Sequence, residues 1–337
     1  MEAKVILEKV VEKQNLTYDE AYFMLDNIMK GTLDPALVSA YLVALRMKGE
    51  TVEEITASAK AMRDNGTHLE NGQDAMEIVG TGGDKAFTFN ISSVSSFVIA
   101  ANGIKVCKHG NRSVSSKSGA ADLYEALGVN ISTDKEQAEK ILNDDGIIFL
   151  FAQKYHTSMK NVGPIRKSLG IRTIFNILGP LTNPALAENM LIGVYDEKLV
   201  RPIAEVLDGL GAKNALVVHG MDGLDEVTLV DKTKVCELRN HTFKEYYFDP
   251  KDYGFRYCSK EDLVGGDPQV NKQIALDILT GKERGPKRDV VIINAALAIY
   301  AFAKDITIEQ AIRAAENALD MGSALAKMEA YVKDSNK

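Results

Sequence analysis

A strand, a glycine-rich turn and a helix follow one another in residues 76–101, which read MEIVGTGGDKAFTFNISSVSSFVIAA. The apolar run 76–79 is typical of a buried strand, and residues 92–101 favour a helix. The same alternation continues along the chain. Further apolar runs predict strands at 104–107, 147–151, 190–194 and 215–218, with helical patterns between them at 120–127 and 198–210.

This alternation predicts a largely parallel sheet covered by helices, because parallel neighbours need a crossover connection that is usually a helix. Gly103, Gly128 and Gly211 follow the predicted helices, and we expect them to end those helices. Residues 226–250 predict antiparallel strands, and helical patterns return from Pro268 onwards.

The first 70 residues contain helical patterns only. Thr17 with Glu20, and Thr51 with Glu54, form two capping-box sequences. In each, the threonine hydroxyl accepts an exposed backbone N–H and the glutamate reaches back. Pro35 stands at a first helical position, where its missing N–H costs nothing. This region therefore predicts a plain helical unit without catalytic side chains.

The composition shifts near residue 70, so we expect a helical domain over residues 1–70 and an α/β domain over residues 71–337. The segment 156–186 is mixed, and the sequence leaves open whether part of it joins the helical domain. The predicted fold class is α/β, with a small helical N-terminal domain beside a large domain built on a mainly parallel central sheet.

Composition and charge disfavour several classes of protein. The 337 residues carry 40 Lys and Arg against 47 Asp and Glu, which gives a net charge of −7. A duplex-binding protein usually has a basic excess, because it replaces counterions on phosphates, so nucleic acid is not an expected partner. The three cysteines are odd in number and widely spaced. This pattern disfavours a disulfide framework and a structural zinc site, and it fits a reducing cytoplasm.

The sequence predicts no membrane or export segment. Residues 1–14 have charges every few positions and no apolar core of a signal peptide. The longest apolar stretch, 290–303, contains Asn294. It is shorter than the roughly 20 residues that a bilayer span needs. It therefore favours a buried helix, and we expect a cytoplasmic protein.

The glycine-rich turn at residues 80–84 is the first candidate site. Ligands of open α/β sheets collect at the carboxyl ends of the strands. Glycines let the backbone approach an anion closely, and the following helix start offers free N–H groups. Neither the P-loop spacing nor GxGxxG is present. The turn predicts a phosphate cradle, with a purely structural tight turn as the alternative.

A second polar loop follows the next predicted strand. Residues 108–119 read KHGNRSVSSKSG and hold three cations, four serines and two glycines. This is a dense set of donors for phosphoryl oxygens. A solvated polar loop is the alternative reading. Two such loops after adjacent strands nevertheless favour a shared site for a polyanion.

A third loop, residues 219–226, ends in the adjacent carboxylates Asp225 and Glu226. Mg²⁺ prefers oxygen ligands and is often shared between a protein and a phosphate substrate. Because two carboxylates would repel a polyanion held by the two preceding loops, we expect metal between them, with an ordinary acidic turn as the alternative. The chain has no HExxH, GxSxG or CxxC…H arrangement, so hydrolytic and thiol-nucleophile schemes have no support.

Arg166 is the fourth candidate. It lies on a predicted helix ahead of residues 172–184, RTIFNILGPLTNP. A planar guanidinium grips a carboxylate through two parallel hydrogen bonds. A surface cation on an amphipathic helix is the alternative.

Five segments, taken in order, resemble the anthranilate phosphoribosyltransferase family: GTGGD (80–84), NISS (90–93), KHGNRSVSSKSGAADLYEALG (108–128), RTIFNILGPLTNP (172–184) and HGMDGLDEVT (219–228). The resemblance runs along most of the chain. It implies transfer of the phosphoribosyl group of phosphoribosyl pyrophosphate to anthranilate with Mg²⁺, giving phosphoribosylanthranilate and pyrophosphate in tryptophan biosynthesis. It also implies a nucleoside-phosphorylase-like phosphoribosyltransferase fold and a homodimer.

Carried over position by position, the resemblance implies a site for each ligand. The residues expected to hold phosphoribosyl pyrophosphate are Gly80, Gly83, Asp84, Thr88, Asn90, Ile91, Ser92, Ser93, Lys108, His109, Gly110, Asn111, Arg112, Ser113, Val114, Ser115, Ser116 and Ala120. Those expected to hold anthranilate are Gly80, His109, Asn111 and Arg166, and those expected to hold magnesium are Ser92, Asp225 and Glu226. We assign no acid or base, because the aromatic amine is already nucleophilic and positioning with electrostatics can suffice.

Two departures from the family pattern stand in the chain. Residues 85–89 read KAFTF where many members have Gly after the Asp, and Ala120 occupies a position that is often Ser. Two other functions remain open. A pyrimidine nucleoside phosphorylase shares the fold but differs in its glycine loop and serine–lysine pattern. A non-catalytic nucleic-acid-binding homologue would show a basic surface and an eroded acidic pair.

Overall fold

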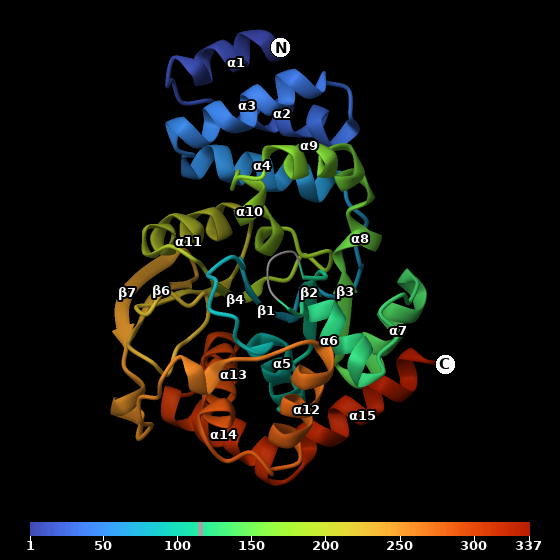
Figure 1. The fold of residues 1–337 in the computed structure, drawn as a ribbon, viewed down its shortest axis with the longest axis vertical. Coiled ribbons are helices and arrows are strands. Elements are labelled where there is room, and N and C mark those ends of the chain that lie inside the picture. The colour runs from blue at the N-terminus through green and yellow to red at the C-terminus, as the bar shows by residue number, and fades with distance from the viewer. Residues whose placement is uncertain (114–116) are drawn as a thin grey trace.

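The computed structural model describes residues 1–113 and 117–337 (Figure 1). Val114, Ser115 and Ser116, three of the residues predicted to bind phosphoribosyl pyrophosphate, lie outside the described residues. Figure 1 shows a helical N-terminal part at one end of the molecule and a larger part built around a sheet at the other.

Four helices form the N-terminal part, as the sequence predicts. They are α1 (Ala3–Val11), α2 (Tyr18–Lys30), α3 (Pro35–Lys48) and α4 (Val52–Asp64). Both capping boxes are confirmed. The Thr17 hydroxyl accepts the Glu20 N–H at 3.4 Å, and a Glu20 carboxylate oxygen accepts the Thr17 N–H at 3.1 Å. At the start of α4, the Thr51 hydroxyl accepts the Glu54 N–H at 3.2 Å, and a Glu54 carboxylate oxygen accepts the Thr51 N–H at 2.8 Å.

Among the described residues, seven strands form one sheet in the order β3-β2-β1-β4-β5-β6-β7. The strands are β1 (Met76–Gly80), β2 (Val106–Gly110), β3 (Ile147–Phe151), β4 (Asn189–Gly193), β5 (Asn214–Gly220), β6 (Thr233–Arg239) and β7 (Thr242–Phe248). The first five are mutually parallel, and β6 and β7 are antiparallel. The predicted mainly parallel sheet is confirmed. The strand order reverses between β1 and β4, which is where ligands of such sheets bind.

Two strand predictions were wrong at their boundaries. The strand expected at 104–107 lies at Val106–Gly110, because Lys108 and His109 are buried in the sheet although they are polar. The antiparallel pair begins at residue 233 and not at 226. The backbone of Val227 is bonded instead to the side chain of Asn294, which accepts at 3.0 Å and donates at 2.8 Å.

The remaining helices surround the sheet. The longer ones are α5 (Ile91–Ala101), α6 (Ala120–Leu127), α7 (Lys135–Asp145), α11 (Val200–Gly209), α12 (Pro268–Leu279), α13 (Pro286–Phe302), α14 (Ile308–Asp320) and α15 (Ser323–Ser335). The short ones are α8 (Ala152–Tyr155), α9 (Gly163–Leu169), α10 (Phe175–Leu178) and the 3₁₀ turns η1 (Thr157–Asn161), η2 (Gly179–Leu181), η3 (Glu197–Leu199), η4 (Pro250–Tyr253) and η5 (Glu261–Leu263). The apolar stretch 290–303 is confirmed as a buried helix, α13. None of the described helices is long and apolar enough to cross a membrane.

The sheet is buried on both faces. In β4, Leu191 packs into a core shared with α5 and α13, whereas Met190 and Ile192 pack into a second core shared with α11 and the N-terminal helices. Alternate residues of one strand therefore enter different cores, as expected for a strand covered on both sides.

Much of the mixed segment 156–186 packs with the helical part. Val162 and Phe175 share a core with Tyr41 of α3. The Asn161 side chain donates a hydrogen bond of 2.7 Å to the carbonyl of Met29, which lies 132 positions earlier in the chain. In Figure 1, α9 lies beside the N-terminal helices and not beside the sheet.

Candidate active site

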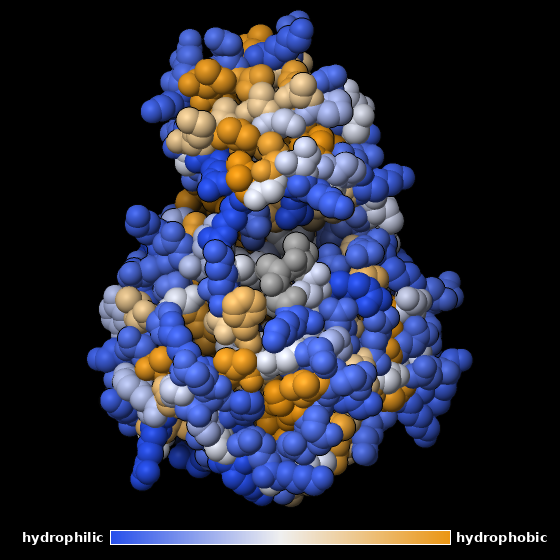
Figure 2. Space-filling view, viewed as in Figure 1, coloured by the Kyte–Doolittle hydropathy of each residue, from blue (hydrophilic) through white to orange (hydrophobic). Residues whose placement is uncertain are grey.

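A cleft of about 520 Å³ lies between the helical part and the carboxyl edge of the sheet. The loops after β1 and β2, the acidic turn after β5 and the segment 152–180 line it, and Met62 of α4 contributes from the helical part. Figure 2 shows the surface hollowed between the two parts, with hydrophilic residues around the opening.

The glycine-rich turn after β1 has an unusual backbone. Gly82 and Gly83 have φ of +73° and +81°, and the non-glycine residues Lys85 and Phe87 have φ of +61° and +53°. Such conformations are costly for side-chain-bearing residues and persist only where the surroundings fix them. Phe87 is held in this way, since its carbonyl accepts the Gly265 N–H at 2.9 Å. Residues 85–89 (KAFTF), which depart from the family pattern, are thus held against the segment before α12.

The turn after β5 places two carboxylates deep in the cleft. Asp225 and Glu226 are 7% and 8% exposed, and Asp84 of the glycine turn stands beside them. Burial, together with the charges of Asp84 and Glu226, holds the pKa of Asp225 well above its usual range. Burial also raises the pKa of Glu226 to about 7, although Lys108 and hydrogen bonds from Ser92 oppose the shift.

Lys108 stands on β2 with a side chain that is almost wholly buried. Its neighbour Glu77 of β1 is also buried, and both carboxylate oxygens accept the His109 N–H, at 3.2 and 3.1 Å. The Asn183 amide donates to the same carboxylate. Burial raises the pKa of Glu77 to about 8 and lowers that of Lys108, and the attraction between the two groups opposes both shifts.

Two histidines line the cleft together. The rings of His109 and His156 meet edge to face with centroids 5.3 Å apart. Nε2 of His156 lies 2.9 Å from the Thr182 carbonyl, whereas Nε2 of His109 has no hydrogen-bond partner in the described part of the chain. Burial holds the pKa of His109 well below its usual range and lowers that of His156 to about 4. Both rings are therefore neutral at pH 7.

The loop after β2 is anchored by acidic residues of α6. Asp122 accepts the Ser113 N–H at 3.1 Å and the Gly119 N–H at 2.8 Å. The Arg112 guanidinium pairs with Asp122 at 3.0 Å and with Glu125 at 2.5 Å. The charge of Arg112 is thus matched by carboxylates, although its side chain also borders the cleft.

Asn90 braces three segments. Its Oδ1 accepts from Asn271 at 2.9 Å and from the Ser118 hydroxyl at 3.3 Å, and its Nδ2 donates to the Ser118 carbonyl at 3.2 Å. These contacts join the start of α5 to the loop before α6 and to α12. These hydrogen bonds of the Asn90 side chain hold the walls of the site together.

Arg166 of α9 reaches the cleft from the opposite wall. Its guanidinium lies over the Phe175 ring, 5.4 Å from the centroid. It is half-buried, and it forms no ion pair with a carboxylate among the residues that the structure describes. The neighbouring Lys167 is exposed to solvent. A partly desolvated guanidinium whose N–H groups form no ion pair in the described part of the chain is suited to bind a carboxylate through two parallel hydrogen bonds.

All the predicted site residues that the structure describes lie along this one cleft. Several lining residues were not predicted. Those on the wall opposite the sheet include Met62, Gln153, His156, Met159, Phe175, Asn176, Gly179 and Pro180. The motif at 172–184 contained a signal for the last four. Nothing local in the sequence marks the others, because packing of the mixed segment against α4 brings them to the cleft.

Comparisons with known proteins give a consistent result. Residues 4–66 match the helical bundle domain of a glycosyl transferase family, and residues 72–325 match its a/b domain. The chain is 54% identical over 333 residues to an anthranilate phosphoribosyltransferase of Methanobrevibacter smithii, covering 99% of both chains. It is 51% identical over 328 residues to one of Ruminiclostridium cellulolyticum, covering 97% of this chain and 96% of the relative.

Solved structures show the same likeness. The anthranilate phosphoribosyltransferase of Thermus thermophilus superposes with a TM-score of 0.94 at 38% identity, covering 98% of this chain and 99% of that one. The Saccharomyces cerevisiae enzyme in complex with phosphoribosyl pyrophosphate and Mg gives 0.91 at 27% identity, covering 99% and 98%. The same enzyme with 4-fluoroanthranilate gives 0.90 at 27% identity, covering 99% and 97%.

Proposed function

The chain belongs to the anthranilate phosphoribosyltransferase family of glycosyl transferases, and we propose that the cleft joins phosphoribosyl pyrophosphate to anthranilate, releasing pyrophosphate, as a step of tryptophan biosynthesis. One observation carries the assignment of the site. Anion-binding loops, an acidic pair and an arginine without a carboxylate partner in the described part of the chain meet in a single cleft.

Phosphoribosyl pyrophosphate is assigned to the sheet side of the cleft. The glycine turn offers backbone N–H groups, and the start of α5 adds Ser92 and Ser93. Lys108 supplies a buried positive charge there. Charge-assisted hydrogen bonds in a desolvated site stabilise negative charge that develops on the leaving group, because little reorganisation is needed during the reaction.

The acidic pair suits Mg²⁺. Raised pKa values at Asp225 and Glu226 show that burial leaves these carboxyls without enough positive charge nearby to ionise readily. A hard divalent cation would restore the ionised form, with Ser92 as a further oxygen ligand. No group of three or more His, Cys, Asp or Glu side chains in the described residues is arranged to hold a metal alone. Pyrophosphate and water would complete the ligand set, and the ion when bound would neutralise charge on pyrophosphate.

Anthranilate is assigned to the opposite wall. Arg166 would fix the carboxylate. Asn111 lies on the side of the phosphate loop, as does Nε2 of His109, which has no hydrogen-bond partner among the residues that the structure describes. In its Nδ1–H tautomer, His109 accepts a hydrogen bond from the substrate amine and aims it at the anomeric carbon. Bond formation then depends on positioning, because the aromatic amine is nucleophilic without a strong base.

The other two functions left open by the sequence are set aside. Relatives that share about half of their residues over nearly the whole chain are anthranilate phosphoribosyltransferases. The net charge is −7 and the acidic pair is intact, which does not suit a nucleic-acid-binding homologue.

The proposal extends to the setting of the enzyme. A homodimer in the cytoplasm, without nucleic-acid or membrane partners, is proposed from the resemblance. We also propose a division at residue 70, with helical residues 1–70 joined by part of 156–186 and an α/β domain over 71–337; the shared core of Val162, Phe175 and Tyr41 supports it.

The test is the loss of anthranilate fluorescence on adding phosphoribosyl pyrophosphate and Mg²⁺. We expect consumption that requires all three components. Phosphorolysis of thymidine or uridine without use of anthranilate would overturn the proposal.

A further inference from the structure

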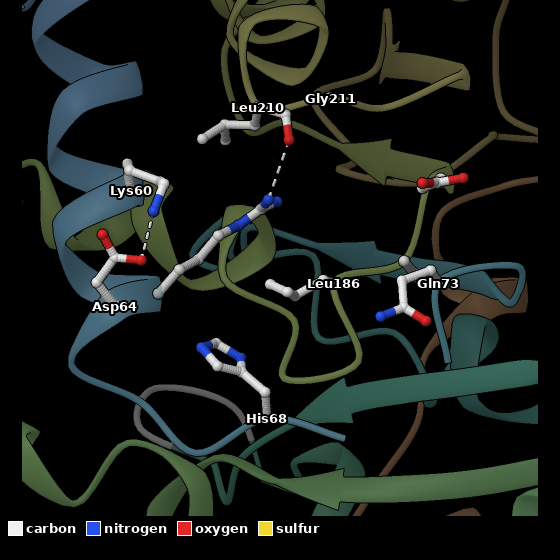
Figure 3. A pocket seen from close by; sticks show the side chains of 10 residues that line it. Lys60, Asp64, His68, Gln73, Leu186, Leu210 and Gly211 are labelled. Atoms are coloured by element: carbon white, nitrogen blue, oxygen red, sulfur yellow. Dashed lines mark hydrogen bonds and ion pairs between the residues drawn. The ribbon is translucent and has the colours of Figure 1, made fainter. Parts of the chain in front are cut away.

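A second cavity of about 310 Å³ shares no lining residue with the cleft. Its walls come from the last turns of α4, the connection to β1, the segment before β4 and the end of α11 (Figure 3). Figure 3 shows Lys60 and Asp64 on one side, Gln73 on the other, and His68 and Leu210 facing each other across the opening. The volume is at the lower end of the range for small-molecule sites.

Arg63 is the most buried charged group among the residues that line this cavity. It is 8% exposed, and its Nε donates to the Leu181 carbonyl at 2.8 Å while Nη1 donates to the Leu210 carbonyl at 3.2 Å. These acceptors are neutral. Within the described ranges, the guanidinium forms no ion pair with a carboxylate and Nη2 donates to no protein group. Burial lowers the pKa of Arg63 to about 10, which leaves it charged at neutral pH.

The other charges around the cavity are already paired. Lys60 pairs with Asp64 at 2.5 Å, and Asp64 also accepts from the Tyr22 hydroxyl at 2.9 Å. Glu188 pairs with Lys213 at 2.5 Å. Arg63 is therefore left without an ion pair in the described residues; the charge of Asp64 acts on it and opposes the lowering of its pKa, but Asp64 is already paired with Lys60. A buried charge is costly unless it is paired, so an anion that reaches Arg63 gains a strong partner.

The apolar part of the cavity wall indicates what the rest of the ligand consists of. Leu186, Ala187 and Leu210 form an apolar surface. The buried Nδ1 of His68 has no hydrogen-bond partner in the described part of the chain. We propose that this pocket is a second ligand site, separate from catalysis, which binds a small organic monocarboxylate with a short aliphatic body. The carboxylate meets Arg63, the ring of His68 borders it, and the aliphatic body lies on the wall formed by Leu186, Ala187 and Leu210.

The test is isothermal titration of the full chain with sodium pentanoate at neutral pH. We expect saturable binding at one site, and no saturable binding of pentanamide, which has the same shape without the charge. Arg63→Gln should weaken pentanoate binding about 10-fold or more, as expected for a lost charged hydrogen bond. Equal binding of pentanamide, or of pentanoate to Arg63→Gln, would overturn the proposal, as would the absence of saturable binding.

Three further variants make the test specific. Arg201→Gln removes a surface arginine of α11 that pairs with Glu205, and it should leave binding unchanged. Arg166→Ala should also leave it unchanged, because a loss there would place the pentanoate in the catalytic cleft and contradict the proposal. Gln73→Trp fills the rim of the cavity and keeps Arg63. It should abolish binding in a folded chain, and it decides the question if Arg63→Gln fails to fold.

Discussion

The backbone N–H of Gly82 donates a 2.5 Å hydrogen bond to Oδ2 of Asp225. This contact joins the glycine turn after β1 to the acidic turn after β5. The candidate phosphate cradle and the candidate magnesium ligand therefore hold each other in place, although 143 positions separate them in the chain. A change in either turn is expected to disturb binding at both.

Gly80→Ala tests this coupling. A Cβ at Gly80 would meet the Asp225 side chain, with Cγ only 2.9 Å away, so the carboxylate must move. We expect a higher Mg²⁺ requirement and a higher KM for phosphoribosyl pyrophosphate, measured by steady-state kinetics. Gly163→Ala is the matched control, because nothing lies within 4 Å of a Cβ there. Normal kinetics for Gly80→Ala would show that the two turns act independently.

The double variant Asp225→Asn with Glu226→Gln removes both buried negative charges and keeps the shapes. We expect the activity curve to move to much higher Mg²⁺, because amide oxygens bind a hard cation more weakly than carboxylates. The exposed pair Glu261→Gln with Asp305→Asn removes the same charge elsewhere and serves as the control. An unmoved curve would place the metal site elsewhere.

Lys108→Ala removes the buried ammonium group after β2. Its loss should raise the KM for phosphoribosyl pyrophosphate more than the KM for anthranilate, since the positive charge faces the phosphate side. Lys105→Ala, directly before the same strand and paired with Asp74 at 3.7 Å, should change neither constant. Unchanged kinetics for Lys108→Ala would contradict the assignment.

Arg166→Ala tests recognition of the anthranilate carboxylate. Losing a charged hydrogen bond typically costs about 1.5–3 kcal/mol, or about 10- to 150-fold in affinity. We expect that loss for anthranilate, nearly unchanged use of phosphoribosyl pyrophosphate, and partial recovery in Arg166→Lys. Lys167→Ala, at the exposed neighbour, is the control. Equal impairment of both substrates, or of neither, would mean that Arg166 is a structural cation of α9.

Stability of the metal-free protein should depend on Glu226. Its pKa is raised from 4.5 to about 7 in the folded state, so between these values the folded protein keeps a proton that the unfolded chain has lost. The contribution of Glu226 to stability therefore falls as pH rises through this window. Relative to Glu226→Gln, the melting temperature of the wild type should fall from pH 5 to pH 7, and Mg²⁺ should reduce that fall. A constant difference between the two proteins would contradict the raised pKa.

The sequence predicts the framework of this protein well, because local signals determine it. Apolar runs locate the core strands, and Thr17 and Thr51 mark the starts of α2 and α4 through contacts three residues away. The prediction fails where polar residues are buried by distant partners. Lys108 and His109 belong to β2 because Glu77 balances the charge and accepts a backbone N–H.

The candidate site was predicted almost completely on its sheet side, whereas Arg166 is the one residue of the opposite wall that was predicted to bind a ligand. Its sheet side consists of loops that directly follow strands, so motif and position agree there. The opposite wall depends on how the mixed segment folds back on α4. His156 reaches the cleft through that packing, and its partner, the Thr182 carbonyl, lies 26 positions away. No local pattern around His156 contains this information.

The shared core of Val162, Phe175 and Tyr41 has a consequence for synthesis of the chain. Residues are added from the N-terminus at about 5–20 per second, so helices α1 to α4 leave the ribosome several seconds before residue 175 exists. During that interval the apolar side chains of these helices that pack against Val162 and Phe175 in the folded protein remain partly uncovered. A nascent chain stalled before residue 160 should therefore expose apolar surface to chaperones, and one stalled well beyond residue 186 should hide it.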